Sequence, residues 1–196
     1  MSEGIGARVL RKEDKRFITG RGRYTDDIKA DKQAYAAFVR SPHAHAIIRG
    51  IDAKVAEETS GVIGVMNGSQ LTGDGIGNII CGWAISSKDG SPMNMGAWSA
   101  LATEKVRYVG DAVAVVIAES QEIARNAAEL VEVDYDVLPA VVNSVESLQN
   151  NASQIHENAP GNLIFDWEIG NLLETDEALK NAAHITKLEL TNNRLS

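Results

Sequence analysis

Residues 112–137 constrain the fold more than any other part of this sequence. They begin with the run AVAVVIA, and a wholly apolar run of this length is typical of a strand buried on both faces. Ser120 follows and can cap a helix over residues 121–130, where apolar side chains recur at helical spacing. Several alanines in that helix would let it lie close to a sheet.

Residues 131–137 (VEVDYDV) complete this segment with strict alternation. Valine and tyrosine side chains share one face, and Glu132, Asp134 and Asp136 share the other. The alternation predicts a half-buried strand with an acidic outer face. Strand, helix and strand within about 25 residues indicate a compact β-α-β unit. We therefore expect a fold that combines strands and helices.

The rest of the chain predicts shorter elements. Residues 1–30 lack periodicity and should form an extended arm, and residues 143–170 should form loops. Asp52 and either Thr175 or Asp176 are suitable helix caps. Apolar patterns, caps and turns together predict strands over 34–39, 46–51, 61–66, 106–109 and 184–190, and short helices over 52–58, 69–71 and 176–183.

Composition argues against several classes of protein. The chain has 196 residues and a formal net charge of −8, which does not favour a nucleic-acid-binding surface. No run approaches the ~20 apolar residues of a membrane span. Cys81 is the only cysteine, so no internal disulfide is possible, which suits the cytoplasm. An iron–sulfur cluster needs about four thiolates, so another chain or domain would have to carry one. Its apolar neighbours predict that Cys81 is buried.

Charge is distributed unevenly along the sequence. Residues 1–30, here called the arm, hold eight lysines and arginines and five acidic residues, although the chain as a whole is acidic. One interpretation is a solvated arm of mixed charge. The other is an arm that docks on an acidic surface of this chain or of a partner.

Residues 72–104, here called the Trp/Met loop, combine loop-forming and core-forming residues. Six glycines predict a loop, whereas Trp83, Met93, Met95 and Trp98 are large and apolar. Loops of this length are usually functional or disordered, and the aromatic residues argue against full disorder. Two interpretations remain: the loop is a contact surface for another protein, or it covers the chain's own sheet.

Candidate metal and phosphate sites in the sequence are weak. The imidazoles of His43 and His45 would share one face of a strand and could bind a metal. No third ligand is near in sequence, so structural, hydrogen-bonded histidines are the favoured interpretation. The glycine-rich residues 20–23 and 73–77 neither follow a clear strand nor open a long helix, as a phosphate-binding loop must.

Candidate catalytic groups are equally weak. The carboxylates of Glu132, Asp134 and Asp136 could act as acid or base only if they were buried, and the polar face of an alternating strand is normally solvated. The serines and threonines show no nucleophile-elbow pattern. We therefore assign no catalytic, cofactor-binding or metal-binding residue to this chain.

A family resemblance is carried by seven separate segments. These are 11–20 (RKEDKRFITG), 22–28 (GRYTDDI), 38–46 (FVRSPHAHA), 106–116 (VRYVGDAVAVV), 127–135 (AAELVEVDY), 159–163 (APGNL) and 188–194 (LELTNNR). In this order they resemble the beginning of the large subunit of the molybdenum hydroxylases, the family of carbon monoxide dehydrogenase, xanthine dehydrogenase and aldehyde oxidase. The resemblance covers most of the chain and is closest to the bacterial three-subunit members.

The resemblance implies a fold of the α+β class, the α/β-hammerhead, with a mixed sheet, an extended basic N-terminal arm and a C-terminal strand. It implies one hammerhead-type domain over residues 1–196, in which 1–30 form the arm, 31–142 the core and 143–196 a C-terminal extension. That extension would lead to a molybdenum-cofactor domain lying beyond this sequence. The chain would then be a fragment of a longer subunit.

The resemblance also implies a function. The chain would be the N-terminal structural and subunit-docking domain of a molybdopterin-dependent oxidoreductase that hydroxylates a small substrate with water as oxygen donor. Molybdenum–molybdopterin cytosine dinucleotide is expected in the missing part, and iron–sulfur clusters and FAD in partner subunits. The chain alone should be inactive, because the family's cofactor-binding segments and its catalytic glutamate lie downstream.

Two questions stay open at this level. Asp111 stands where family members commonly have glutamine, and the sequence gives neither this change nor the Trp/Met loop a defined role. The alternative function is a stand-alone, non-catalytic binding or assembly module. An independent hydrolase is not supported by any motif.

Overall fold

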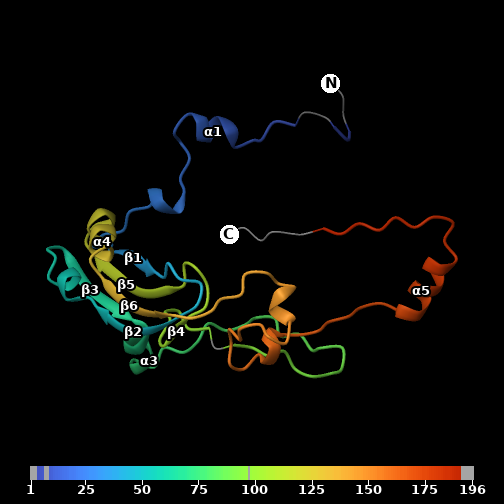
Figure 1. Ribbon diagram of the computed structural model, residues 1–196. Helices are drawn as coiled ribbons and strands as arrows, with labels where there is room; N and C mark the ends of the chain where they lie inside the picture. Colours follow the sequence, from blue (N-terminus) through green and yellow to red (C-terminus); the bar gives the residue numbers. More distant parts are fainter. Residues whose placement is uncertain (1–3, 7–8, 97, 191–196) are drawn as a thin grey trace. The chain divides into compact units, whose positions relative to one another are not determined.

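The computed structural model describes residues 4–6, 9–96 and 98–190. The chain separates into two compact units, each described by itself below. The first unit comprises Met1–Gly77 and Ser99–Leu138, and the second comprises Asn78–Trp98 and Pro139–Ser196. The first unit contains both β-sheets of the described residues (Figure 1).

The first sheet has β5 (Ala112–Ala118) at its centre, between β1 (Tyr35–Arg40) and β3 (Val62–Asn67), and both pairings are antiparallel. A central strand is covered on both faces, which accounts for the apolar run AVAVVIA in β5. Val113, Ala114, Val116 and Ala118 are fully buried. The prediction of a strand buried on both faces is confirmed.

The second sheet has the order β4 (Lys105–Val106), β2 (Ala46–Asp52), β6 (Glu132–Val137), again with antiparallel pairs only. The register of β2 against β6 shifts between Ile48 and Gly50, which marks a β-bulge. As predicted, β6 alternates, and its acidic side chains are exposed.

Three short helices accompany the sheets. Helix α4 (Gln121–Ala128) packs against β1 and β5 through its buried alanines. Ser120 caps it as predicted, since the Ser120 hydroxyl accepts a hydrogen bond from Ile123 N at 3.2 Å. Helices α2 (Lys54–Glu57) and α3 (Gly68–Gly73) confirm the two other short helices expected in this unit.

The core of the first unit is built from small side chains in two clusters. One is centred on Ala114 and Val116 of β5, and the other on Val106 of β4 and Val113 of β5. Val39, Ile51 and Val133 pack against both clusters, so residues from β1, β2 and β6 connect the two sheets. This apolar contact joins the two sheets into one packed body.

The arm is less extended than predicted. It contains helix α1 (Asp14–Ile18) and a 3₁₀ turn, η1 (Thr25–Asp27). The Phe17 ring stacks on the Tyr24 ring with 5.4 Å between the ring centroids. The Arg16 guanidinium lies over the same Phe17 ring, 5.1 Å from its centroid. These local contacts fold residues 14–27 back on themselves, which no periodic pattern in the sequence signals.

The second unit consists mainly of loops. Among its described residues, the regular elements are two 3₁₀ turns, η2 (Glu146–Leu148) and η3 (Pro160–Asn162), and helix α5 (Leu172–Lys180). Asn162 connects its loops: the amide nitrogen donates to the Ser147 and Ser153 carbonyls at 3.0 and 2.9 Å, and the amide oxygen accepts from Ile155 N at 2.9 Å.

Several predictions for the fold are wrong. The sheets are antiparallel rather than mixed, and β5 and β6 lie in different sheets, so the predicted β-α-β unit is not a parallel crossover. Strand β4 covers two residues instead of 106–109. The C-terminal strand predicted over residues 184–190 does not form, and none of the described strands pairs with these residues. Helix α5 begins four residues early because Asn171, rather than Thr175 or Asp176, caps it.

The predicted division into arm, core and extension within a single domain stays a prediction.

Among the described residues, no helix has the length and apolar character required to cross a membrane.

Candidate docking surfaces

The histidine pair occupies a packed position rather than an open metal site. His45 is 4% exposed, and its carbonyl accepts a hydrogen bond from Leu138 N at 2.9 Å. The His43 ring meets Tyr135 edge-on at 5.0 Å. Over the described ranges, no three His, Cys, Asp or Glu side chains gather as metal ligands would. The two histidines therefore act in packing at the junction of β2 and β6.

Asp111 has a structural role that the sequence did not reveal. Its carboxylate accepts a hydrogen bond from Arg107 N at 3.0 Å, and its carbonyl accepts one from Ser41 N at 2.8 Å. Burial, followed by the charge of Asp111, raises the pKa of Tyr108. Asp111 therefore closes the turn between β4 and β5 and fixes it to the buried Ser41 that follows β1.

Both glycine-rich segments terminate helices. Gly20 and Gly75 have φ angles of 69° and 77°, a left-handed conformation that glycine adopts without steric cost. After each, a backbone N–H bonds to a carbonyl five residues earlier: Arg21 N to Arg16 O at 2.9 Å, and Ile76 N to Leu71 O at 3.0 Å. This is the Schellman pattern of a helix C-terminus. A phosphate cradle needs a helix N-terminus, so neither segment fits one.

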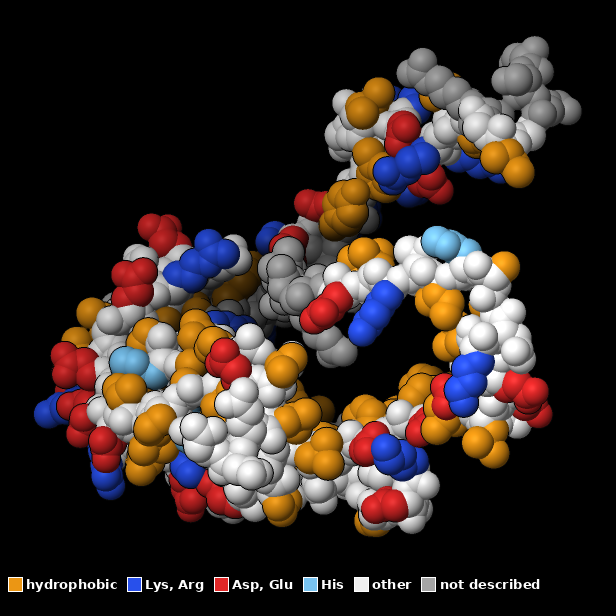
Figure 2. Space-filling view, turned by 45° about the vertical axis from the view of Figure 1, so that its right-hand side comes forward, with side chains coloured by type: hydrophobic (Ala, Val, Ile, Leu, Met, Phe, Trp, Pro, Cys, Tyr) orange, Lys and Arg blue, Asp and Glu red, His pale blue; other side chains and the backbone are white. Residues whose placement is uncertain are grey.

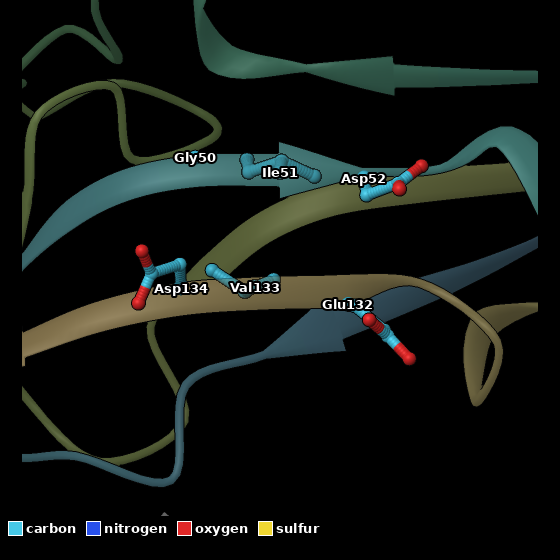
Figure 3. Close-up of a pocket in the computed structure, with 6 residues that line it drawn as sticks. All are labelled: Gly50, Ile51, Asp52, Glu132, Val133 and Asp134. Atoms are coloured by element: carbon cyan, nitrogen blue, oxygen red, sulfur yellow. The ribbon is translucent and has the colours of Figure 1, made fainter.

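The acidic face of β6 borders a shallow surface hollow. Asp52, Glu132 and Asp134 line it, together with Gly50, which pairs with Asp134 across the two strands (Figure 3). Asp136 lies further along the strand and pairs with Arg49. All three β6 carboxylates are exposed. Exposed carboxylates keep water around them, so this face is not suited to acid–base catalysis.

The Trp/Met loop is exposed in the part that belongs to the second unit. Trp83 is 81% exposed and Trp98 57%. Cys81 is also exposed, with Sγ 3.5 Å from the Trp83 carbonyl oxygen, and the prediction that it is buried is wrong. Exposed aromatic side chains are typical of protein interfaces, and the contact-surface interpretation stays a prediction.

A second exposed segment escaped the sequence analysis. This segment comprises residues 163–180 and is called the 163–180 segment below. At its start, apolar side chains alternate with other residues, of which Asp166 and Glu168 are acidic. The four apolar side chains are 39–80% exposed: Leu163, Phe165, Trp167 and Ile169. The alternation could have been found by the same test that identified β6.

The 163–180 segment is connected to the Trp/Met loop by hydrogen bonds. Asn94 N donates to the Ile164 carbonyl at 2.8 Å, and Lys88 N donates to the Asp166 carbonyl at 2.7 Å. The Lys88 ammonium also lies 2.8 Å from the Asp166 carboxylate, and this hydrogen bond raises the pKa of Lys88. These contacts fix the backbone at the start of the segment, where Phe165 and Trp167 are exposed.

The space-filling view agrees with this distribution, since hydrophobic side chains (orange) reach the surface in many places (Figure 2). The arm contributes to this surface. Val9, Leu10 and Ile18 are 75–84% exposed and lie among its lysines and arginines.

Comparison with known proteins explains the fold of the first unit. Residues 19–139 match the family described as "Aldehyde oxidase and xanthine dehydrogenase, a/b hammerhead domain". The chain belongs to this family. The resemblance found in the sequence is thus confirmed, and the two small antiparallel sheets are those of its hammerhead domain.

Individual relatives extend the likeness beyond that domain. The chain is 32% identical to the carbon monoxide dehydrogenase large chain of Afipia carboxidovorans, over 98% of this chain and 24% of the relative. It is 37% identical to the nicotine 6-hydroxylase large subunit of Paenarthrobacter nicotinovorans, over 92% of this chain and 21% of the relative. The chain therefore spans about a quarter or less of these relatives.

A solved structure of similar fold is the crystal structure of Cu,Mo-CO dehydrogenase in its carbon monoxide reduced state. It has a TM-score of 0.69 and 32% identity, over 92% of this chain and 23% of that chain. That relative is named for its copper and molybdenum, and the described residues of this chain show no site for either metal. No chemical step is therefore assigned to residues of this chain.

Proposed function

We propose that this chain is the N-terminal structural and subunit-docking domain of a molybdopterin-dependent oxidoreductase large subunit. The observation that carries the proposal is the hammerhead fold of the first unit, together with relatives named as large chains or large subunits of oxidoreductases. The intact enzyme would work in the cytoplasm, and the chain alone would be inactive.

The cofactors of the proposed enzyme lie outside this chain. A molybdenum centre on molybdopterin cytosine dinucleotide would supply the oxidation of a small substrate, with water as the oxygen donor. Iron–sulfur and FAD subunits would receive the electrons. The part played by this chain is to present a rigid first unit and an exposed second unit to those partners.

The docking role is supported by the exposure of the Trp/Met loop. Trp83 and Trp98 extend from a unit that has almost no apolar core of its own, and tryptophan is enriched among residues that dominate binding energy. Burying such side chains against a partner removes a large apolar area from water. We propose that this loop contacts the iron–sulfur subunit.

The size and composition of the native assembly test this function. An antibody against residues 31–142 would be used to isolate the protein from its source cells under native conditions. We expect a polypeptide several times larger than 21.1 kDa, carrying molybdenum and co-purifying with iron–sulfur and flavin subunits. A polypeptide near 21 kDa without metal would instead support the alternative, a stand-alone binding or assembly module.

The proposed contact can be tested within that assembly. Replacing Trp83 and Trp98 by serine should reduce the amount of iron–sulfur subunit that co-purifies. The matched control is Ile63→Ser, which removes an exposed apolar side chain (62% exposed) from β3. If the unchanged protein, the tryptophan variant and Ile63→Ser all recover the same amount of iron–sulfur subunit, the loop is excluded from the contact.

A further inference from the structure

Asn67 and Gly68 form the one Asn–Gly pair of the sequence, at the junction where β3 ends and α3 begins. Glycine has no side chain to hinder the approach of its backbone nitrogen to the preceding carboxamide. In an Asn–Gly pair this nitrogen can therefore close a five-membered ring with the asparagine side chain. The junction thus contains a dipeptide that is chemically reactive by its nature.

The fold uses both residues of the pair. Asn67 is the N-cap of α3, since its carboxamide oxygen accepts a hydrogen bond from Gln70 N at 3.1 Å. The Gln70 side-chain oxygen accepts one from Asn67 N at 2.8 Å, which completes a capping box. A Cβ atom at Gly68 would lie 2.6 and 2.7 Å from the carbonyl oxygens of Ala102 and Leu101. Packing therefore requires glycine here, and capping favours asparagine before it.

The same contacts oppose ring closure in the folded chain. A planar five-membered ring requires the Cβ of Asn67 and the nitrogen of Gly68 to be eclipsed about the bond between them. At the observed ψ angle of 174° for Asn67 these two atoms are staggered. Rotation about this bond would disrupt the capping box and the hydrogen bond that the Thr72 hydroxyl donates to the Gly68 carbonyl at 3.0 Å. Closure therefore requires local opening of α3.

We propose that Asn67 is a site of spontaneous deamidation whose rate is set by the opening of α3. In the open form, Gly68 N attacks the carboxamide carbon of Asn67 and closes a succinimide ring, and ammonia leaves with the proton from Gly68 N. Water then opens the ring at either carbonyl and gives aspartate or isoaspartate. The reaction needs no enzyme and no redox partner. The inference goes beyond the proposed docking function and does not rest on it.

The two products have different consequences for the base of the Trp/Met loop. Aspartate keeps the normal backbone and remains a good N-cap for α3. Isoaspartate inserts a methylene group into the backbone and so displaces Gly68 from the carbonyls of Leu101 and Ala102. The loop begins in α3 and ends just after Ala102. Isoaspartate in place of Asn67 therefore loosens the contact between the two ends of the loop.

Peptide mass spectrometry of the purified chain, incubated at mildly alkaline pH, tests the site. Deamidation at Asn67 should be at least about tenfold slower than in a synthetic peptide of residues 60–73, because the folded chain reacts only through local opening. Gln70→Ala removes half of the capping box and should raise the rate about fivefold, the factor expected for loss of a cap. Gln121→Ala, at an exposed position of α4, is the matched control and should leave the rate unchanged.

Two results would overturn the proposal. One is a folded chain that deamidates at Asn67 as fast as the peptide, and the other is an equal rate in the unchanged chain and in Gln70→Ala. Gln70→Glu retains a side chain that can complete the capping box and should keep the slow rate. Circular dichroism checks that the variants fold, and the comparison of the unchanged chain with the peptide stands even if Gln70→Ala does not.

Thermal unfolding of the separated products tests the effect on the loop base. Deamidation adds a negative charge, so the products can be isolated by ion exchange and compared with the variant Asn67→Asp. The isoaspartate form should unfold at least about 2 °C below Asn67→Asp, because only isoaspartate displaces Gly68. Equal midpoints would show that the packing of Gly68 tolerates the longer backbone and would refute the loosening of the loop.

Discussion

The two units of this chain are stabilised by different interactions. In the first, valine and alanine side chains from both sheets and α4 are fully buried. In the second, Ala159 is the one fully buried hydrophobic residue among the described positions, and side-chain amides such as Asn162 connect the loops. The first unit therefore has the core of an independent domain, whereas the second has the exposed apolar surface of a contact region.

The chain contains natural reporters of this difference. All three tryptophans lie in the second unit, and all four tyrosines lie in the first. Tryptophan fluorescence thus follows the second unit, while tyrosine absorbance follows the first. Transitions that do not coincide would show that the units unfold separately, and the predictions below use this separation.

The largest expected effect comes from leucine truncation in the core of the first unit. Leu101 is 2% exposed, so Leu101→Ala should lower the free energy of unfolding by about 2–5 kcal/mol through lost burial and a cavity. Leu173 in α5 is 80% exposed, and Leu173→Ala should change it by less than about 0.5 kcal/mol. Urea unfolding of both variants measures the contrast. Equal effects would contradict the division into a packed and an exposed unit.

A close approach of backbone to backbone predicts the next effect. A Cβ atom at Gly68 would lie 2.6 Å from the Ala102 carbonyl oxygen and 2.7 Å from that of Leu101. Gly68→Ala should therefore destabilise the first unit by about 1–3 kcal/mol. A Cβ at Gly64 meets no atom within 4 Å, so Gly64→Ala is the matched control. Thermal unfolding followed by tyrosine absorbance would reveal the difference.

Loss of the Asn162 side chain should affect only the second unit. Asn162→Gly removes three hydrogen bonds and retains the positive φ angle of 58° at no steric cost. We expect about 1–3 kcal/mol of local destabilisation, because half-buried partners lose their hydrogen bonds. Hydrogen exchange at the Ile155 amide should accelerate, while exchange in β5 should not. Asn151→Gly, at an exposed position of the same unit, serves as control.

The smallest effect concerns alkaline pH. Burial raises the pKa of Tyr135 above its ordinary value of 10.0. The neutral phenol therefore contributes stability that is fully present below the ordinary pKa and is lost as pH rises through the raised pKa of the folded state. Tyr135→Phe should reduce the loss of stability across roughly pH 9 to 11. An unchanged pH dependence in denaturant titrations would show that Tyr135 does not ionise in this range.

The sequence by itself determined those elements whose signals are local. The apolar run of β5, the Ser120 cap of α4 and the alternation of β6 each lie within a few residues, and each was predicted correctly. The family resemblance was also readable, because its segments keep their order along the chain. Local periodicity encodes which face of an element is buried, and it needs no knowledge of the partner.

Tertiary structure decided what those elements pair with and which loops stay exposed. Strands β5 and β6 entered different sheets because each paired with strands distant in sequence, and residues 184–190 formed no strand without such a partner. The hydrogen bonds of Asp111 and the exposure of Cys81 and Trp83 likewise depend on contacts between distant segments. A side chain's own sequence neighbourhood carries little information about such contacts, because chain topology brings the partners together.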